Sequence, residues 1–203
     1  MTIEIPYSEA CERNKDPILT VISDYLDRSK CVLEIGTGTG QHAIYFSQVK
    51  PHLRWQTSDQ SHYLSGIEAQ LEVARVGNVK GPVLLDVKQE CWFKHEQRFD
   101  LIYTANTFHI MADDEVEAFF ERLNTVMNKT CFLVVYGPFK YEGMFTSESN
   151  AAFDLRLRDR GVGSAIRDFE WVNQLAVDSG LTLIRDVKMP ANNQCLIWGV
   201  GHD

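Results

Sequence analysis

Short, mostly apolar runs alternate along this chain with longer stretches in which apolar residues recur every three or four positions. The short runs are typical of strands buried on both faces of a sheet, and the longer stretches are typical of amphipathic helices. In chain order the pattern predicts strands at about 32–35, 53–58, 83–87, 99–105, 131–136, 181–187 and 194–200. It predicts helices at about 17–26, 43–49, 63–76, 113–127 and 169–179.

The order of these elements predicts the fold class. Asp16 and Pro17 are typical of a helix cap followed by the first helical position, so the first helix is expected to begin there. Strands and helices then alternate through the first five strands, and the last two strands are joined by a short link at 189–193. We therefore expect an α/β fold with a doubly wound, mostly parallel, seven-stranded Rossmann-like sheet, helices on both faces and an antiparallel last strand. Such sheets bind ligands outside the carboxyl ends of their strands.

The first predicted strand runs into a turn that is typical of nucleotide binding. Residues 32–35 are apolar except for Glu34, and three glycines then stand at alternate positions: Gly36, Gly38 and Gly40, with Thr37 among them. Glycines suit a backbone that turns with positive φ or lies directly against a ligand, and the start of the next helix offers unpaired N–H groups. We therefore expect Glu34, Thr37 and the three glycines to contact a cofactor.

The spacing of the glycines favours S-adenosylmethionine (SAM) over a dinucleotide. The dinucleotide motif G-x-G-x-x-G requires a glycine where this chain has Gln41, and the third glycine falls one residue earlier. A carboxylate at Glu34 would repel phosphate oxygens and attract an ammonium group. The stretch from Leu33 to Gly40 resembles motif I of the class I SAM-dependent methyltransferases. A glycine-rich turn without any ligand is the alternative interpretation.

Composition limits the class of partner. At 203 residues the chain is expected to form one domain, 1–203, and its formal charge of −8 argues against binding to nucleic acid or to an anionic membrane. No apolar run reaches the ~20 residues that a bilayer-spanning helix needs, and no N-terminal signal segment is present, so a cytoplasmic location is expected. The five cysteines are scattered and include no C-x-x-C pair, so they predict neither a disulfide framework nor a metal site.

Two aspartates end predicted strands on the ligand-binding side of the sheet. Asp59 comes nineteen residues after Gly40, at the end of the second strand, where a carboxylate binds ribose hydroxyls in nucleotide-binding sheets. Asp86 ends the third strand, a position at which methyltransferases often keep a polar residue near the adenine ring. Alternatively, Asp59 is a helix cap or loop residue and Asp86 is a solvated turn residue.

The candidates for chemistry follow the fourth and fifth strands. Asn106 stands where enzymes that methylate nucleic-acid bases carry an Asp or Asn followed by two prolines, and the absence of those prolines argues against base methylation. Asn106 is expected to hold a polar group of the substrate or the amino end of SAM. His109 has the pKa range of a general base, and Tyr136 is the second candidate for that role. Alternatively, His109 is a structural histidine in a strand-to-helix turn.

Four further segments carry a narrower resemblance, at 136–139, 145–154, 163–168 and 189–193. Together they resemble the DUF938 family of SAM-dependent methyltransferase-like proteins, which are also labelled methyltransferase-like 26 in animals. The resemblance extends over nearly the whole chain. It implies the methyltransferase fold and SAM as cofactor, but it names no methyl acceptor.

The segment 140–167 is too long and too polar for an ordinary connection, so we expect it to form a lid. Arg167, Asn192 and Asn193 lie in loops that should overhang the same pocket, and they are the candidates for substrate contacts. The two asparagines are also compatible with a tight turn that needs positive φ. Three further arginines, Arg156, Arg158 and Arg160, are expected on a solvated helix face.

These residues support a leading function and an alternative from another class. The leading hypothesis is a SAM-dependent methyltransferase that acts on an unidentified small molecule. The sulfonium already makes the methyl group electrophilic, so the protein must mainly align the reacting atoms. The alternative is a SAM- or nucleotide-binding module without turnover, which acts as a sensor or through a protein partner. An oxidoreductase is disfavoured by the glycine spacing.

Overall fold

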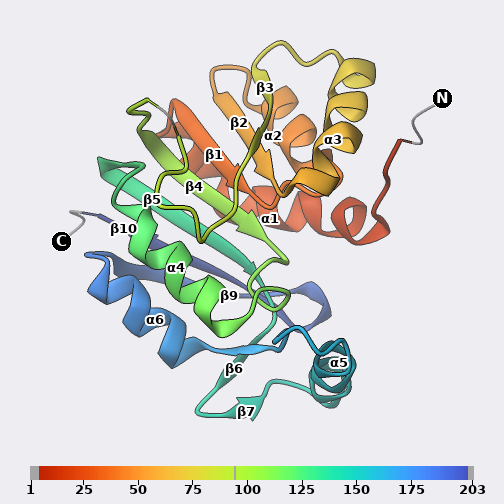
Figure 1. The fold of residues 1–203 in the computed structure, drawn as a ribbon, viewed down its shortest axis with the longest axis vertical. Coiled ribbons are helices and arrows are strands. Elements are labelled where there is room, and N and C mark those ends of the chain that lie inside the picture. The colour runs from red at the N-terminus through yellow and green to blue at the C-terminus, as the bar shows by residue number, and fades with distance from the viewer. Residues whose placement is uncertain (1–4, 94, 201–203) are drawn as a thin grey trace.

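The computed structural model describes residues 5–93 and 95–200 and shows an α/β fold around one large sheet (Figure 1). Its seven strands lie in the order β3-β2-β1-β4-β5-β10-β9. They are β1 (Cys31–Ile35), β2 (Arg54–Asp59), β3 (Val79–Leu84), β4 (Phe99–Ala105), β5 (Met127–Gly137), β9 (Thr182–Met189) and β10 (Asn193–Gly199). Strands β1 to β5 pair in parallel, whereas β10 is antiparallel to both β5 and β9. The predicted sheet and its antiparallel last strand are confirmed.

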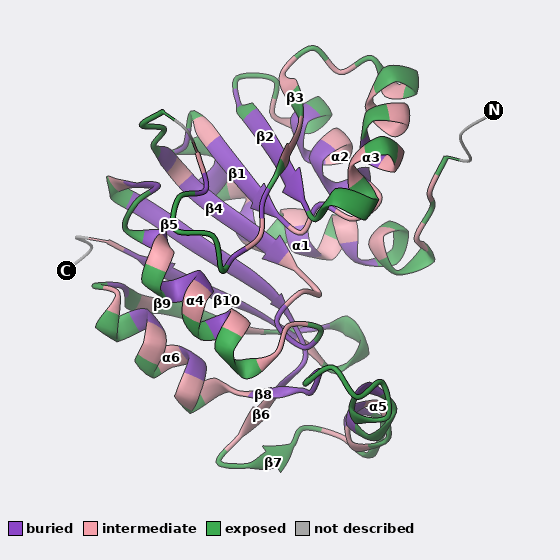
Figure 2. Ribbon diagram, in the orientation of Figure 1, coloured by how far each residue is buried: buried purple, intermediate pink, exposed green. Residues whose placement is uncertain are grey.

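Helices cover both faces of the sheet (Figure 1). They are α1 (Glu9–Asp27), α2 (Gln41–Val49), α3 (Ser61–Ala74), α4 (Asp113–Leu123), α5 (Glu148–Arg158) and α6 (Phe169–Asp178). Apolar residues of α4 and α6 form one core with the sheet, and those of α1 and α2 form a second core on the other face. The inner strands β1, β2, β4, β5 and β10 are buried along most of their length (Figure 2), as expected for strands with apolar residues on both faces, whereas the edge strands β3 and β9 are largely exposed or half-buried. No helix among the described residues is long and apolar enough to cross a bilayer.

A small second sheet occupies much of the segment expected to form a lid. It has the order β7-β6-β8, with β6 (Phe139–Tyr141), β7 (Met144–Phe145) and β8 (Arg167–Asp168). Helix α5 lies between β7 and β8 in the chain, and Figure 1 shows it at the end of the molecule away from α3. Because β5 runs almost directly into β6, this unit begins at the carboxyl end of a central strand.

The prediction that the first helix begins at Pro17 is wrong. Helix α1 begins eight residues earlier, at Glu9, and its cap is Ser8, whose Oγ accepts a hydrogen bond from the backbone N–H of Cys11 (3.3 Å). Pro17 lies inside the helix, where it removes one backbone donor without ending the helix. Residues 9–15 are mostly polar, and therefore apolar spacing gave no signal for this first part of α1.

The observed ends of β3 and α4 differ from the predicted ones, because buried apolar residues continue past the end of each element. Strand β3 spans Val79–Leu84 and not 83–87, since Leu85 and Val87 are buried in the link that follows it. Helix α4 ends at Leu123, and Met127, expected on its apolar face, already begins β5. In the described part of the link between β3 and β4 no helix occurs, so the alternation of strands and helices is interrupted there.

Candidate functional site

The turn after β1 has a backbone that only glycine adopts without strain. Gly36, Gly38 and Gly40 have φ values of 75°, 62° and 81°. A Cβ on Gly36 would lie 2.3 Å from Cγ2 of Thr107, so this glycine is also required by close packing against the loop after β4. A Cβ on Gly38 would meet no atom within 4 Å. The backbone of Gly38 therefore faces open space, as a backbone that contacts a ligand must.

Asp59, at the end of β2, is bound to this turn. Its Oδ2 accepts a hydrogen bond from the backbone N–H of Gly38 (2.7 Å), and its Oδ1 accepts one from Gln60 (2.7 Å). The backbone N–H groups of Gly36 and Thr37 donate to the carbonyl of Ser58 (3.1 Å each). Burial raises the pKa of Asp59, while the hydrogen bond from Gly38 opposes that shift. The structure thus brings Asp59 and the glycine turn together, as the sequence predicted.

Glu34 is buried beneath the turn. Its Oε2 accepts hydrogen bonds from Nε1 of Trp55 (3.1 Å) and from Oγ1 of Thr37 (3.2 Å). Burial nevertheless raises the pKa of Glu34 to about 8, and the nearby charge of Asp59 acts in the same direction. No cation pairs with Glu34 among the described residues. The ammonium group of a ligand would stabilise the anionic form of this buried carboxyl group.

Asp86 lies two residues beyond β3 and not at its last position. The backbone N–H of Leu85 donates to the carbonyl of Asp59 (3.0 Å), which keeps Asp86 close to the end of β2. The carboxylate of Asp86 accepts a hydrogen bond from the backbone N–H of Lys88 (2.9 Å). Asp86 is therefore a turn residue that lies beside the candidate site, and its place near an adenine ring stays a prediction.

Asn106 and His109 lie in the loop between β4 and α4. Asn106 has a φ of 59°, which is rare for a residue other than glycine, and its backbone N–H donates to the carbonyl of Tyr136 (2.8 Å). Its side-chain amide has no hydrogen-bond partner among the described residues. A strained backbone that holds a free polar side chain at a strand end is typical of functional sites.

His109 is 7% exposed and packs edge-on against Phe153 of α5, with ring centroids 5.3 Å apart. Burial lowers the pKa of His109 to about 4, and the charges of Arg160 and Arg167 contribute to the shift. The imidazole is therefore neutral at pH 7. It is also a weaker base than a free histidine, so the expected pKa range of a general base does not apply to this structure.

Tyr136 is buried on the α1 face of the sheet. Burial raises the pKa of its phenol, and hydrogen bonds with Asn14 and Asn193 only partly oppose the shift. A phenol with a raised pKa keeps its proton at neutral pH, so the side chain is poorly suited to accept one. The structure gives Tyr136 contacts that connect α1 and the start of β10.

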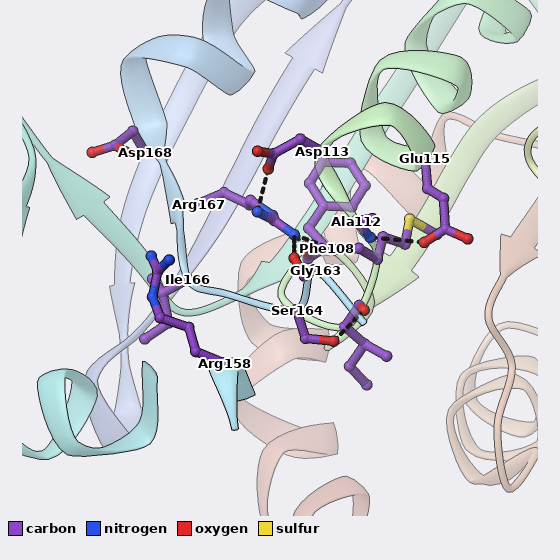
Figure 3. Close-up of polar contacts among 12 residues, drawn as sticks. Phe108, Ala112, Asp113, Glu115, Arg158, Gly163, Ser164, Ile166, Arg167 and Asp168 are labelled. Atoms are coloured by element: carbon purple, nitrogen blue, oxygen red, sulfur yellow. Dashed lines mark hydrogen bonds and ion pairs between the residues drawn. The ribbon is translucent and has the colours of Figure 1, made fainter. Parts of the chain in front are cut away.

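Arg167 was expected to contact a substrate, but its guanidinium is used inside the protein (Figure 3). Its Nε donates to the carbonyl of Phe108 (3.1 Å), and its Nη2 donates to the carbonyls of Gly163 (2.8 Å) and Met111. Its Nη1 also pairs with Asp113 at the start of α4. Arg167 is only 6% exposed. It therefore fixes the loop that carries His109, and a contact between Arg167 and a substrate stays a prediction.

Asn192 and Asn193 form the turn between β9 and β10. Ala191 and Asn192 both have a φ of 58°, and Nδ2 of Asn193 donates to the carbonyl of Pro190 (3.2 Å). The carbonyl of Asn192 accepts a hydrogen bond from Asn150 of α5 (2.9 Å). The expected alternative, a tight turn with positive φ, describes Asn192, whereas Asn193 has an extended backbone and begins β10. The side chain of Asn192 also ties this turn to the lid helix, as its Nδ2 donates to Ser149 (3.0 Å).

Sequence analysis missed the contribution of α1 to this site. Gln41, the first residue of α2, binds Ser8, and Oδ1 of Asn14 accepts a hydrogen bond from Nε2 of His42 (2.7 Å). No signal for these contacts was available, because the first part of α1 was not predicted as helix. A hollow of about 630 Å³ lies beside the lid, with Lys140, Ile166, Arg167 and Trp171 in its wall. None of the residues around that hollow belongs to the glycine turn.

Solved structures with the same fold are SAM-dependent O-methyltransferases. An O-methyltransferase family protein from Burkholderia thailandensis aligns with a TM-score of 0.82 at 16% identity, covering 96% of this chain and 59% of that one. The mitomycin 7-O-methyltransferase MmcR aligns with a TM-score of 0.78 at 19% identity, covering 93% and 54%. Human N-acetylserotonin methyltransferase, in complex with SAM, aligns with a TM-score of 0.77 at 16% identity, covering 96% and 53%.

At this identity the alignments show the fold alone, and the chain spans little more than half the length of each of these proteins. The described residues contain no group of three or more His, Cys, Asp or Glu side chains arranged to hold a metal ion. The glycine turn, Asp59 and Glu34 fit a cofactor with a ribose and an ammonium group. A family model described as "Protein of unknown function (DUF938)" matches residues 5–199, and the chain therefore belongs to the DUF938 family.

Proposed function

We propose that this protein is a SAM-dependent methyltransferase that acts on a small molecule. The observation that carries the proposal is the turn of three left-handed glycines, in which Gly38 donates its backbone N–H to Asp59 and leaves the space beside it open. The fold supports it, since one neighbour with this fold is described in complex with SAM and another with SAH (S-adenosylhomocysteine).

Four residues would hold the cofactor. Asp59 would accept hydrogen bonds from the ribose hydroxyls through the lone pairs that Gly38 and Gln60 leave free. Glu34 would pair with the ammonium group of the methionine part, because it is buried without a cation. Asp86 would lie near the adenine ring. The free amide of Asn106 would bind either the amino end of SAM or the acceptor.

The bound cofactor supplies an electrophilic methyl group, so the protein's own residues must position the acceptor and exclude water. The neutral imidazole of His109 would accept a hydrogen bond from the acceptor and orient it. Its low pKa makes full deprotonation before transfer unfavourable. Segment 140–167 would cover the acceptor, since Phe153 of α5 already packs on His109. One neighbour is described as an O-methyltransferase family protein and another as mitomycin 7-O-methyltransferase, which makes a hydroxyl group the acceptor to test first.

Calorimetric titration with SAM, SAH and NAD tests the cofactor. We expect SAM and SAH to bind and NAD to bind weakly or not at all. Gly38→Ala should abolish SAM binding, because the methyl group would fill the open space beside the turn. Gly180→Ala is the matched control: Gly180 has a φ of 80° and the same open surroundings, but it lies after α6. Comparable or tighter NAD binding by the parent protein would contradict the proposal.

A SAM-binding module without turnover is the second candidate, and one observation favours it. Arg167, Asn192 and Asn193 use their side chains within the protein and leave little on the acceptor side free. Turnover separates the two functions. The protein is incubated with labelled SAM and a metabolite extract, and formation of SAH with transfer of label to a small molecule is expected. Tight SAM binding with no transfer in any extract would favour the binding module.

A further inference from the structure

The short segment before α1 is attached to the first residue after the glycine turn. The backbone N–H of Ser8 donates to Oε1 of Gln41 (2.6 Å), and Nε2 of Gln41 donates back to the carbonyl of Ser8 (3.3 Å). The same Oε1 also accepts a hydrogen bond from Thr39 in the turn (2.9 Å). Gln41 is 8% exposed. One buried amide thus joins the glycine turn to the segment 5–8, which we call the N-terminal strap.

A second contact holds the other end of the strap. A Cβ on Gly66 of α3 would lie 3.2 Å from Cγ of Pro6, so the proline ring rests closely on a helix position that has no side chain. Glycine inside a helix costs about 1 kcal/mol relative to alanine, so its presence in α3 requires a packing reason, and the contact with Pro6 supplies one. Figure 1 shows the strap running beside α3 before it enters α1.

The contacts of Ser8 with α2 and of Pro6 with α3 place the strap across these two helices. Each helix follows one of the strand ends that are proposed to bind the cofactor. Helix α2 follows the glycine turn, and α3 follows Asp59. The first turns of α1 extend the cover, because Asn14 is hydrogen-bonded to His42 in the first turn of α2 (2.7 Å). A cofactor held between the turn and Asp59 therefore lies beneath an edge formed by the strap and the start of α1.

We propose that Gln41 is a positioning residue that holds the N-terminal strap closed and thereby limits how fast the cofactor enters and leaves. The inference rests on the proposed function, since it takes SAM as the ligand of the glycine turn. The pairing of Gln41 with Ser8 is present in the ligand-free protein, so it must open for entry as well as for release. Loss of the pairing should raise both rate constants by a similar factor and leave their ratio nearly unchanged.

Two variants test the strap in different ways. Gln41→Ala removes both hydrogen bonds to Ser8, and Ser8→Pro removes the backbone donor while keeping the carbonyl. Ser8→Ala is the matched control, because it removes the Oγ that caps α1 but keeps the backbone paired with Gln41. A second control is Gln174→Ala, on the exposed side of α6, where the glutamine binds only Asp178.

Association and dissociation of labelled SAH are measured by rapid mixing and by chase with unlabelled SAH. For Gln41→Ala we expect both rate constants to rise about tenfold, since roughly two neutral hydrogen bonds no longer resist opening, and for Ser8→Pro we expect a smaller rise of several-fold, since only one of them is lost. The dissociation constant should stay within a few-fold, and both controls should keep the parent rates. A second readout is amide hydrogen exchange, in which the N–H of residue 8 should exchange faster in Gln41→Ala.

Parent-like rates in both variants would overturn the inference and leave the proposed function intact. A raised dissociation constant with an unchanged association rate would also overturn it, because Gln41 would then contact the cofactor directly. If the parent protein binds neither SAM nor SAH, the proposed function fails first, and the role of the strap in cofactor exchange fails with it. Each of these results differs from the expected one, in which SAH associates and dissociates faster while its dissociation constant is nearly unchanged.

Discussion

The charged side chains at the ends of β1 and β2 differ from the charged side chain of Arg167, beside β4 and β5, in how far they are paired within the protein. Asp59 and Glu34 accept hydrogen bonds from the turn and its neighbours, yet no described residue forms an ion pair with either carboxyl group. On the other side of the sheet, the guanidinium of Arg167 is bound by three carbonyls and a carboxylate. We call the first region the cofactor half and the second the acceptor half. Among the described residues, the carboxyl groups of the cofactor half have no ion-pair partner, whereas in the acceptor half Arg167 is bound internally, although the side-chain amide of Asn106 is free.

This contrast predicts that stability depends most on the acceptor half. Arg167→Ala should lower the free energy of unfolding by about 3 kcal/mol, because the carbonyls of Phe108, Met111 and Gly163 lose a buried donor. SAM affinity should change only a few-fold. Chemical denaturation and calorimetry measure the two effects, with Arg156→Ala as control, since Arg156 is exposed and lies only over the ring of Phe153. A large loss of SAM affinity in a stable Arg167→Ala protein would mean that Arg167 serves cofactor binding and not mainly stability.

Binding should depend most on the cofactor half. Asp59→Ala should weaken SAM binding about ten- to hundredfold, because charge-assisted hydrogen bonds to the ribose contribute roughly 1.5–3 kcal/mol. Asp86→Ala should weaken it less than about tenfold, since its carboxylate is bound to the backbone of Lys88. Calorimetry compares the two variants. Unchanged affinity in a folded Asp59→Ala protein would make Asp59 a structural residue that only holds the glycine turn.

The same contrast explains which features the sequence could predict. The glycine turn and β4 are local patterns, and the structure places both where the residues predicted them. Three of the four partners of Arg167, at Phe108, Met111 and Asp113, lie more than fifty residues away in the chain, and no local pattern indicates that they would surround it. Likewise, the link from Ser8 to Gln41 joins a polar stretch without helical spacing to α2. The sequence therefore could not predict the contacts between polar groups that are far apart in the chain.

His109 connects the acceptor half to the pH dependence of stability. Its pKa in the folded protein is about 4, below the ordinary value of 6.5, so the unfolded chain binds more protons between these values. Stability contributed by the neutral imidazole is present above pH 6.5 and is lost as the pH falls toward 4. Between pH 6.5 and 5, the parent should lose about 1.5 kcal/mol more than His109→Asn.

Denaturation of both proteins at several pH values measures the difference, and His42, whose pKa is also lowered to about 4, titrates equally in both. The acceptor reaction should show no inflection near pH 6.5. Such an inflection, absent in His109→Asn, would mean that the imidazole is exposed to solvent during turnover and that the acceptor half opens.

Glu34 should give the smallest effect and the most specific one for the cofactor half. Its pKa of about 8 in the ligand-free protein means that the carboxyl group is largely protonated at pH 7. An ammonium group that pairs with it stabilises the anion, so SAM or SAH should release close to one proton on binding at pH 7. Calorimetry in two buffers with different ionisation enthalpies measures the proton count. Adenosine, which has no ammonium group, should release none, and Glu34→Gln should release none with SAH while losing only several-fold in affinity. Equal proton release by adenosine and SAH would place the ammonium group away from Glu34, and the cofactor half would then owe its selectivity to the turn and Asp59 alone.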